Sequence, residues 1–155
     1  MRTCAYLHAH AIFRFLFLPI TRLILRCYGY RDGIRIPYQT QIGSGFYISS
    51  DGGIVINPYT VIGRNCNISG QVTLGEAGSE AGKGQPVIGD NVYIGPRAKV
   101  IGVVRVGNKV VISADCVVSE DIPDASVVFG SPGRAVPLDE SAIYIYRTDY
   151  AREFI

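Results

Sequence analysis

Residues 88–118 read IGDNVYIGPRAKVIGVVRVGNKVVISADCVV, and an aliphatic residue returns at every sixth position of this stretch. The recurring residues are Ile88, Ile94, Val100, Val106, Ile112 and Val118. A small or β-branched residue follows four positions later, as in Val92, Ala98, Val104, Val110 and Cys116. This period matches neither the 3.6-residue period of an α-helix nor the two-residue period of a strand. It is typical of a short strand followed by a corner, repeated along the chain.

Three strand–corner units can close a triangular coil, and each coil then stacks on the previous one at the spacing of parallel strands, ~4.8 Å. The aliphatic residues point into the resulting prism, and the small residues near the corners also turn inward. Asparagine tolerates the left-handed backbone of a tight corner. The expected corner asparagines are Asn57, Asn65, Asn67, Asn91 and Asn108. A β-sandwich is the alternative, but its turn signals would recur every ~8–12 residues. The period therefore predicts an all-β chain folded as a parallel β-helix.

The same period extends upstream, with one slip of two residues. Its earlier members are Ile36, Ile42 and Ile48, and after the slip Ile56, Ile62, Ile68 and Leu74. These repeats predict a β-helix over residues 34–136, with about four coils, which is enough to bury a repeat core. We expect the register to end after Val118, with a turn at 121–124 and a last strand and exit turn within 126–133.

A glycine-rich, polar insert interrupts the register between Leu74 and Ile88. It spans residues 75–87, which is too long for one strand–corner unit, so it must leave the prism wall as a loop. Long loops on rigid scaffolds often carry function. This loop is therefore a candidate part of a site.

The two flanks have different compositions. The apolar stretch 11–25 is interrupted by Arg14, Pro19 and Arg22, so we expect no membrane-spanning helix. We predict that residues 1–33 form a helical cap on the first coil, since repeat folds need terminal caps. An amphipathic helix lying on a membrane surface is the alternative. The tail, residues 137–155, is either a short capping helix or a strand that returns along the prism.

Composition limits the classes of function. The net charge of +2 gives no argument for nucleic-acid binding. The four cysteines are Cys4, Cys27, Cys66 and Cys116, and they form no CxxC pair. We therefore expect reduced, buried thiols in a cytoplasmic protein rather than disulfides or a metal site.

Four motifs lie in a fixed order along the repeats. They are GIVI at 53–56, VTLG at 72–75, the glycine-rich insert, and PVIGDNVYIG at 86–95. This order resembles the hexapeptide-repeat acyltransferases, in particular the serine O-acetyltransferase branch, and VVFGSP at 127–132 looks like the closing turn of that branch. The resemblance covers about 34–135 and implies a left-handed coil. The short N-terminal segment looks most like the serine acetyltransferase-like proteins of capsule and exopolysaccharide clusters.

The resemblance implies a homotrimer that holds acetyl-CoA in the groove between neighbouring prisms. By position, Gly75, Ala98 and Ala114 would pass the cofactor by backbone contact, and Ser131 would lie near its nucleotide end. The family usually has glycine where this chain has Arg97 and Asp115. Arg97 would then either obstruct the pantetheine arm or pair with a phosphate.

Acetyl transfer to a hydroxyl needs a base, usually histidine, and a hydrogen-bond donor for the developing oxyanion. The resemblance places the family's two histidines at Ser50 and Gln85, and a family acid at Arg35. Asp51, beside Ser50, is the candidate substitute base, although Asp-Gly-Gly is also a turn signal. Gln85 can donate a hydrogen bond to an oxyanion but cannot take a proton.

Two functions remain open from the sequence. The first is an O-acetyltransferase that moves an acetyl group from acetyl-CoA to a hydroxyl of a sugar or serine-like small acceptor, such as a glycan precursor. Contact with the inner face of the membrane through the N-terminal segment would suit such a role. The alternative is a catalytically impaired trimeric scaffold or partner protein, because the chain's two histidines, His8 and His10, both lie in the N-terminal segment.

Overall fold

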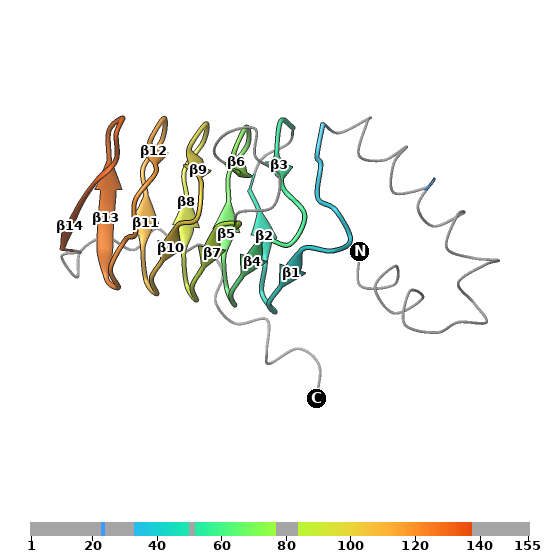
Figure 1. Ribbon diagram of the computed structural model, residues 1–155, viewed down its shortest axis with the longest axis horizontal. Coiled ribbons are helices and arrows are strands. Elements are labelled where there is room, and N and C mark those ends of the chain that lie inside the picture. Colours follow the sequence, from blue (N-terminus) through green and yellow to red (C-terminus); the bar gives the residue numbers. More distant parts are fainter. Residues whose placement is uncertain (1–22, 24–32, 50–51, 77–83, 138–155) are drawn as a thin grey trace.

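The computed structural model describes residues 23, 33–49, 52–76 and 84–137, and short strands joined by corners make up nearly all of them (Figure 1). The strands are β1 (Gln41–Ile42), β2 (Tyr47–Ile48), β3 (Val55–Ile56), β4 (Val61–Ile62), β5 (Asn67–Ile68), β6 (Thr73–Gly75), β7 (Val87–Ile88), β8 (Tyr93–Ile94), β9 (Lys99–Ile101), β10 (Arg105–Val106), β11 (Val111–Ile112), β12 (Val117–Val118), β13 (Ser126–Phe129) and β14 (Arg134–Pro137). The predicted helical cap and the tail beyond residue 137 lie outside the described residues. None of the described helical residues belongs to a helix long and apolar enough to cross a membrane.

The strands form three sheets, which are the three faces of a prism. Sheet A has the order β12-β9-β6-β3, sheet B has β1-β4-β7-β10, and sheet C has β14-β13-β11-β8-β5-β2. Each coil contributes one strand to each sheet, and neighbouring strands are parallel except for β13 and β14. This is the left-handed parallel β-helix of hexapeptide repeats that the sequence predicts.

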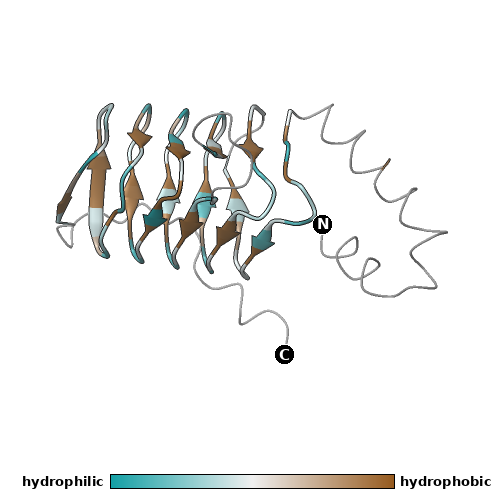
Figure 2. Cartoon of the chain, viewed as in Figure 1, coloured by the Kyte–Doolittle hydropathy of each residue, from teal (hydrophilic) through white to brown (hydrophobic). Residues whose placement is uncertain are grey.

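The core of the prism is a stack of the recurring aliphatic residues. Ile68, Ile94 and Ile112 lie in register on successive strands of sheet C and are fully buried. The small residues near the corners also turn inward and are buried, namely Val92, Ala98, Val104, Val110 and Cys116. In Figure 2 brown hydrophobic residues recur along the strands, whereas β1 and β10 also carry teal hydrophilic ones. Burial of these two sets excludes water from the prism and provides its main stabilisation.

The two-residue slip is taken up at one corner. Gln41 pairs with Val61 across the slip, and Val55 pairs with Thr73 after it, so the strands stay in register despite the two extra residues. The extra residues lie where Gly52 and Gly53 have φ values of 85° and 72°. Glycine suits that backbone because it lacks the Cβ that makes positive φ costly.

The glycine-rich insert leaves the register unchanged. β6 ends at Gly75, β7 begins at Val87, and Ile62 and Ile88 are still paired across the insert. Residues 77–83 lie outside the described part of the chain. The chain re-enters the prism at Gly84, where a Cβ would lie 2.6 Å from Cγ2 of Val103. The exposed Val103 side chain therefore packs directly against the returning backbone.

Two expectations about corners and register are wrong. Asn65 and Asn91 have the left-handed backbone expected of corners, but Asn67 lies within β5, and neither Asn57 nor Asn108 has a positive φ. The register also continues beyond Val118, because Ile122 bridges to Val106 and β13 pairs with β11. The chain reaches Ile122 by a corner shortened by two residues, which hides the period in the sequence. The strand β14 then runs antiparallel to β13 and ends the described prism.

Candidate functional site

The corner between sheets C and A collects most of the candidate cofactor residues. We call it the C–A corner, and its successive levels carry Gly53, Gln71, Arg97 and Asp115. The Arg97 amide donates to the Gly70 carbonyl at 3.0 Å, and the Asp115 amide donates to the Pro96 carbonyl at 2.9 Å. A Cβ on Gly53 would lie 3.2 Å from the Gln71 Cα, so these two levels are also in contact. The corner is therefore a continuous ladder, with a step of ~4.8 Å per coil.

An ion pair spans two levels of this ladder. The Arg97 guanidinium donates through Nε to Asp115 Oδ1 and through Nη2 to Oδ2, both at 2.6 Å. Both side chains are 59% exposed. The hydrogen bond from Arg97 lowers the pKa of the Asp115 carboxyl, and the bond to Asp115 raises the pKa of Arg97. In the structure, therefore, the Asp115 carboxylate is the partner of the Arg97 guanidinium.

The other candidate cofactor residues divide into two places. Ala98 is buried directly after Arg97, and Ala114 is exposed directly before Asp115. The turn at 130–133, which contains the exposed Ser131, lies at the next level, because the Gly133 amide donates to the Val117 carbonyl at 2.7 Å. Gly75, in contrast, is buried at the far end of β6, away from the C–A corner.

Gln85 lies at the corner between sheets A and B, which we call the A–B corner. It is half-buried, and its register partners in neighbouring coils are Tyr59 and Val103, both 68% exposed. The Oε1 atom of Gln85 is buried and accepts no hydrogen bond from the described residues. The side-chain amide of Gln85 therefore lies beside exposed apolar side chains, and its Oε1 atom can still accept a hydrogen bond.

Ser50 and Asp51 lie outside the described residues, between Ser49 at the end of a sheet C strand and Gly52 at the C–A corner. Ser49 begins a row of hydroxyls that the sequence analysis did not anticipate. Ser49 Oγ donates to Ser69 Oγ at 3.2 Å, and Ser69 Oγ lies 3.3 Å from the Tyr93 hydroxyl. Both serines directly follow an inward isoleucine, so the repeat itself was the signal that would have brought them together.

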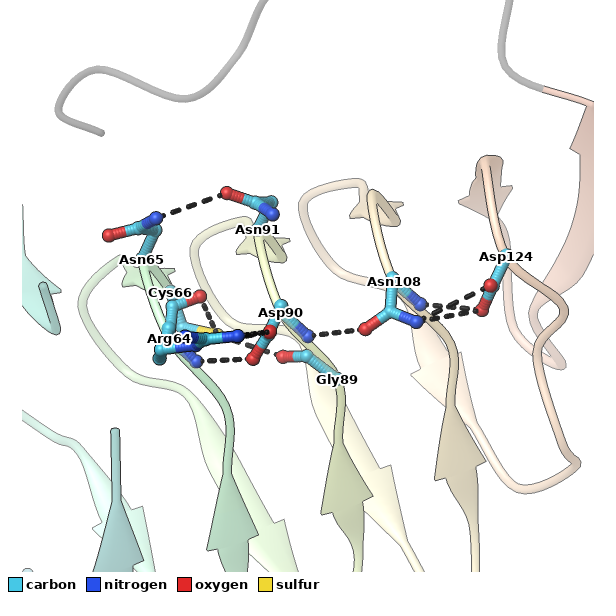
Figure 3. Close-up of polar contacts among 8 residues, drawn as sticks. All are labelled: Arg64, Asn65, Cys66, Gly89, Asp90, Asn91, Asn108 and Asp124. Carbon is cyan, nitrogen blue, oxygen red and sulfur yellow. Dashed lines mark hydrogen bonds and ion pairs between the residues drawn. The ribbon is translucent and has the colours of Figure 1, made fainter. Parts of the chain in front are cut away.

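A second polar ladder, also unanticipated, follows the corner between sheets B and C, which we call the B–C corner (Figure 3). The Arg64 amide donates to Asp90 Oδ1 at 2.7 Å, the Asp90 amide to Asn108 Oδ1 at 2.8 Å, and the Asn108 amide to Asp124 Oδ1 at 2.7 Å. The Arg64 guanidinium also pairs with Asp90 at 3.2 Å. The hydrogen bond from the Arg64 amide is the main reason that the pKa of Asp90 is lowered. These side chains hold successive coils together.

The described cysteines are not suited to nucleophilic chemistry. Cys66 and Cys116 are free and buried. Burial raises the pKa of the Cys66 thiol to about 11, so the reactive thiolate is scarce at neutral pH. Within the described ranges, no cluster of three or more His, Cys, Asp or Glu side chains has the arrangement of a metal site.

Comparison with known proteins places the chain in a family. The family model described as bacterial transferase hexapeptide (six repeats) matches residues 85–120. A serine acetyltransferase from Helicobacter pylori is 37% identical over 134 residues, which are 86% of this chain and 78% of that protein. The chain belongs to the serine acetyltransferase branch of the hexapeptide-repeat transferases.

Other members of this branch agree in sequence and in structure. The serine acetyltransferase of Bacillus subtilis is 41% identical over 128 residues, which are 83% of this chain and 59% of that protein. The structure of soybean serine acetyltransferase complexed with serine has a TM-score of 0.72 at 30% identity, over 86% of this chain and 56% of that one. The chain therefore spans little more than half the length of these two relatives.

Membership in this branch defines which positions of the prism deserve attention. Arg35, which the sequence resemblance aligns with a family acid, is exposed and bridges in parallel to Val55 in sheet A. Gln85 adjoins sheet A at the A–B corner, and Gly52 and Gly53 lie at the opposite end, at the C–A corner. Arg35 and Gln85 thus both border sheet A.

Proposed function

We propose that the protein is an O-acetyltransferase that moves an acetyl group from acetyl-CoA to a hydroxyl of a sugar or serine-like small acceptor. The observation that carries this proposal is the grouping of Arg97, Ala98, Ala114 and Ser131 on consecutive levels of the C–A corner. An extended donor lying along that corner would meet these residues in order. Its thioester end would then lie toward Gly52 and Gly53, which directly follow Ser50 and Asp51.

The same geometry favours a homotrimer. Within one prism, sheet A separates Gln85 from the C–A corner, so the two halves of the proposed catalytic site cannot meet. A threefold arrangement with sheet A toward the axis would bring the A–B corner of one copy to the C–A corner of the next. Closed cyclic assembly of this kind is common in homo-oligomers. Sedimentation should give the mass of three chains. The mass of a single chain would contradict a site shared between neighbouring copies.

The proposed reaction is a direct transfer within a ternary complex. The acceptor oxygen attacks the thioester carbonyl carbon while Asp51 takes the hydroxyl proton, and the C–S bond then breaks. The CoA thiolate leaves and regains that proton from Asp51, so the carboxylate is regenerated. The Gln85 amide of the neighbouring copy donates a hydrogen bond to the oxyanion of the intermediate. In this scheme Asp51 supplies the acid–base chemistry that histidine supplies in the family.

The test combines binding with turnover. Calorimetric titration measures acetyl-CoA binding, and a thiol-release assay with serine and with neutral sugars measures transfer. Asp51→Asn should lower kcat by ~10²–10⁴, the usual contribution of a general base. Glu120→Gln, at an exposed carboxyl beyond β12, serves as the matched control and should leave kcat unchanged. An unchanged rate in Asp51→Asn would show that another group is the base.

The alternative is a non-catalytic trimer that serves as a scaffold or as a partner of an active relative. One feature supports it: Gln85, which the sequence resemblance aligns with a family histidine, cannot accept a proton. Under this alternative, acetyl-CoA binding and thiol release are both absent while the trimer persists. Binding without release would indicate a scaffold that has kept its donor groove.

We propose in addition that the protein works in the cytoplasm, at the inner face of the membrane. The support is the sequence of the N-terminal segment, in which arginines interrupt an apolar stretch, as in helices that lie at a membrane surface. Flotation with anionic liposomes should carry the full chain but not a variant in which Arg14, Arg22 and Arg26 are replaced by glutamine. Equal flotation of both would remove this part of the proposal.

A further inference from the structure

The Arg97–Asp115 pair occupies two positions at which a side chain is costly. Arg97 has a φ of 61° and Asp115 a φ of 58°. Non-glycine residues are disfavoured in this left-handed region, and aspartate tolerates it better than arginine. An exposed ion pair contributes little to stability, because water screens it. Eight described non-glycine residues share this backbone, so what distinguishes the pair is its bonding.

The bonding of the pair differs from that of the Arg64–Asp90 ion pair. Asp90 accepts from the Arg64 backbone as well as from its side chain, so that carboxylate is fixed between coils. Asp115 accepts two bonds from the Arg97 side chain and none from a described backbone amide. Rotation of two exposed side chains is therefore enough to separate Arg97 from Asp115.

The geometry of the pair also suits exchange. A guanidinium that binds a carboxylate through two parallel N–H···O bonds can bind two phosphate oxygens in the same way. Arg97 reaches one level up the corner to bond Asp115, which brings its guanidinium toward the turn at 130–133. This is the stretch between Ala98 and Ser131 along which the proposed donor would pass.

On the basis of the proposed acetyl-CoA site, we infer that Arg97 is the phosphate-binding residue of that site and that Asp115 holds it when no donor is bound. A phosphate-bearing thioester displaces the Asp115 carboxylate from the guanidinium and takes over its two hydrogen bonds. Displacement also moves both side chains off the backbone between Ala98 and Ala114, which opens the path of the pantetheine arm. Binding of the phosphate to Arg97 and opening of the groove for the pantetheine arm thus occur together.

If this exchange occurs, substitutions of Asp115 and Arg97 change the affinity for acetyl-CoA in opposite directions. Asp115 competes with the phosphate for Arg97, so removing its charge strengthens donor binding. Removing Arg97 weakens donor binding, because the phosphate loses its partner. A merely structural pair would give both substitutions the same sign, since each breaks the same contact.

The test measures the affinity of the full-length protein for two thioesters by calorimetry or competition. Acetyl-CoA carries phosphates, and S-acetyl-N-acetylcysteamine carries none. The variants are Asp115→Asn and Arg97→Asn, because asparagine tolerates the left-handed backbone. Lys109→Asn is the matched control: Lys109 is an exposed cation with a φ of 55° at the B–C corner.

We expect Asp115→Asn to bind acetyl-CoA about 10-fold more tightly and Arg97→Asn about 10-fold more weakly, each step corresponding to one charge-assisted contact. Lys109→Asn should match the unsubstituted protein. Arg97→Asn should not weaken binding of the phosphate-free thioester.

Two results would overturn the exchange while leaving the proposed function intact. One is weaker acetyl-CoA binding by both variants, and the other is unchanged binding by both. If the unsubstituted protein and all three variants fail to bind acetyl-CoA at millimolar concentration, the proposed function itself fails. Circular dichroism of each variant establishes that the prism is folded, so that a loss of binding is not a loss of structure.

Discussion

Two corners of the same prism each carry an arginine–aspartate pair, but the pairs differ in what they bond. At the B–C corner, Asp90 joins a ladder in which side-chain oxygens accept from backbone amides of the neighbouring coil (Figure 3). At the C–A corner, Arg97 and Asp115 bond each other's side chains. The first arrangement connects the backbones of neighbouring coils. The second bonds only side chains, so Arg97 can separate from Asp115 and bind another group. Whether an ion pair stabilises the fold therefore depends on the hydrogen bonds that its carboxylate also accepts from backbone amides.

The largest effect is expected from closing the space at the B–C corner. A Cβ on Gly89 would lie 2.7 Å from the Gly107 carbonyl oxygen and 2.8 Å from Asn108 Oδ1. Backbone must move to accept it, so Gly89→Ala should lower the free energy of unfolding by ~1–3 kcal/mol or more, as overpacking does. Gly75→Ala is the control, since its Cβ would meet nothing closer than 3.7 Å. Urea unfolding measures both, and equal midpoints would contradict tight stacking at this corner.

A smaller loss is expected when the B–C ladder is shortened by one member. Asp124→Ala removes the acceptor of the Asn108 amide, which donates to Asp124 Oδ1 at 2.7 Å. The expected cost is about 1 kcal/mol, the usual net contribution of one hydrogen bond. Ser119→Ala, at an exposed position after β12, serves as the control in the same unfolding experiment. A midpoint no different from that of the control would mean that water replaces the carboxylate without loss.

Acidification should lower the free energy of unfolding through the carboxylates at both corners. The folded-state pKa values of Asp90 and Asp115 lie below the ordinary value of 3.8. Each carboxylate therefore stabilises the fold above pH 3.8, and this contribution is lost as the pH falls through the lowered pKa. Asp90→Asn and Asp115→Asn should each flatten the decline of unfolding free energy below pH 4. A decline as steep as in the unsubstituted protein would contradict the shift at that residue.

The smallest effect is expected from Asp115→Asn at neutral pH. Its carboxylate is exposed and makes no hydrogen bond to a described backbone amide, so water screens the ion pair and the thermal midpoint should fall only slightly. Measured beside Asp90→Asn, which should lower that midpoint, the variant isolates the contrast between the corners. A loss as large as that of Asp90→Asn would make the C–A pair a structural tie.

Sequence periodicity predicts the prism down to the pairing of its strands. Ile62, Ile88 and Val106 are paired across coils because the same hexad position recurs, even with an insert between two of them. The pairing of Arg97 with Asp115 was also implicit in the period, since their separation of 18 residues equals one regular coil. The period does not predict the shortened corner before Ile122, because Pro123 and Asp124 have the composition of an ordinary turn.

The candidate site was less accessible to sequence reasoning than the fold. The grouping of Ala98, Ala114 and Ser131 depends on which corner each residue occupies, and this follows only once the three faces are assigned. The B–C ladder depends on side chains that reach the backbone of the next coil, and propensities say nothing about such contacts. Ser50 and Asp51 remain predictions, because the described residues stop on either side of them.

The reversed strand β14 has a consequence for self-association. A stack of parallel coils ends in an edge that can template another coil, which is the route by which repeat folds grow into fibres. Here the last strand runs antiparallel to β13 and ends at Pro137, which has no backbone N–H to donate. A parallel coil from a second molecule finds no matching register at sheet C. The reversal thus removes a parallel template from this edge of sheet C.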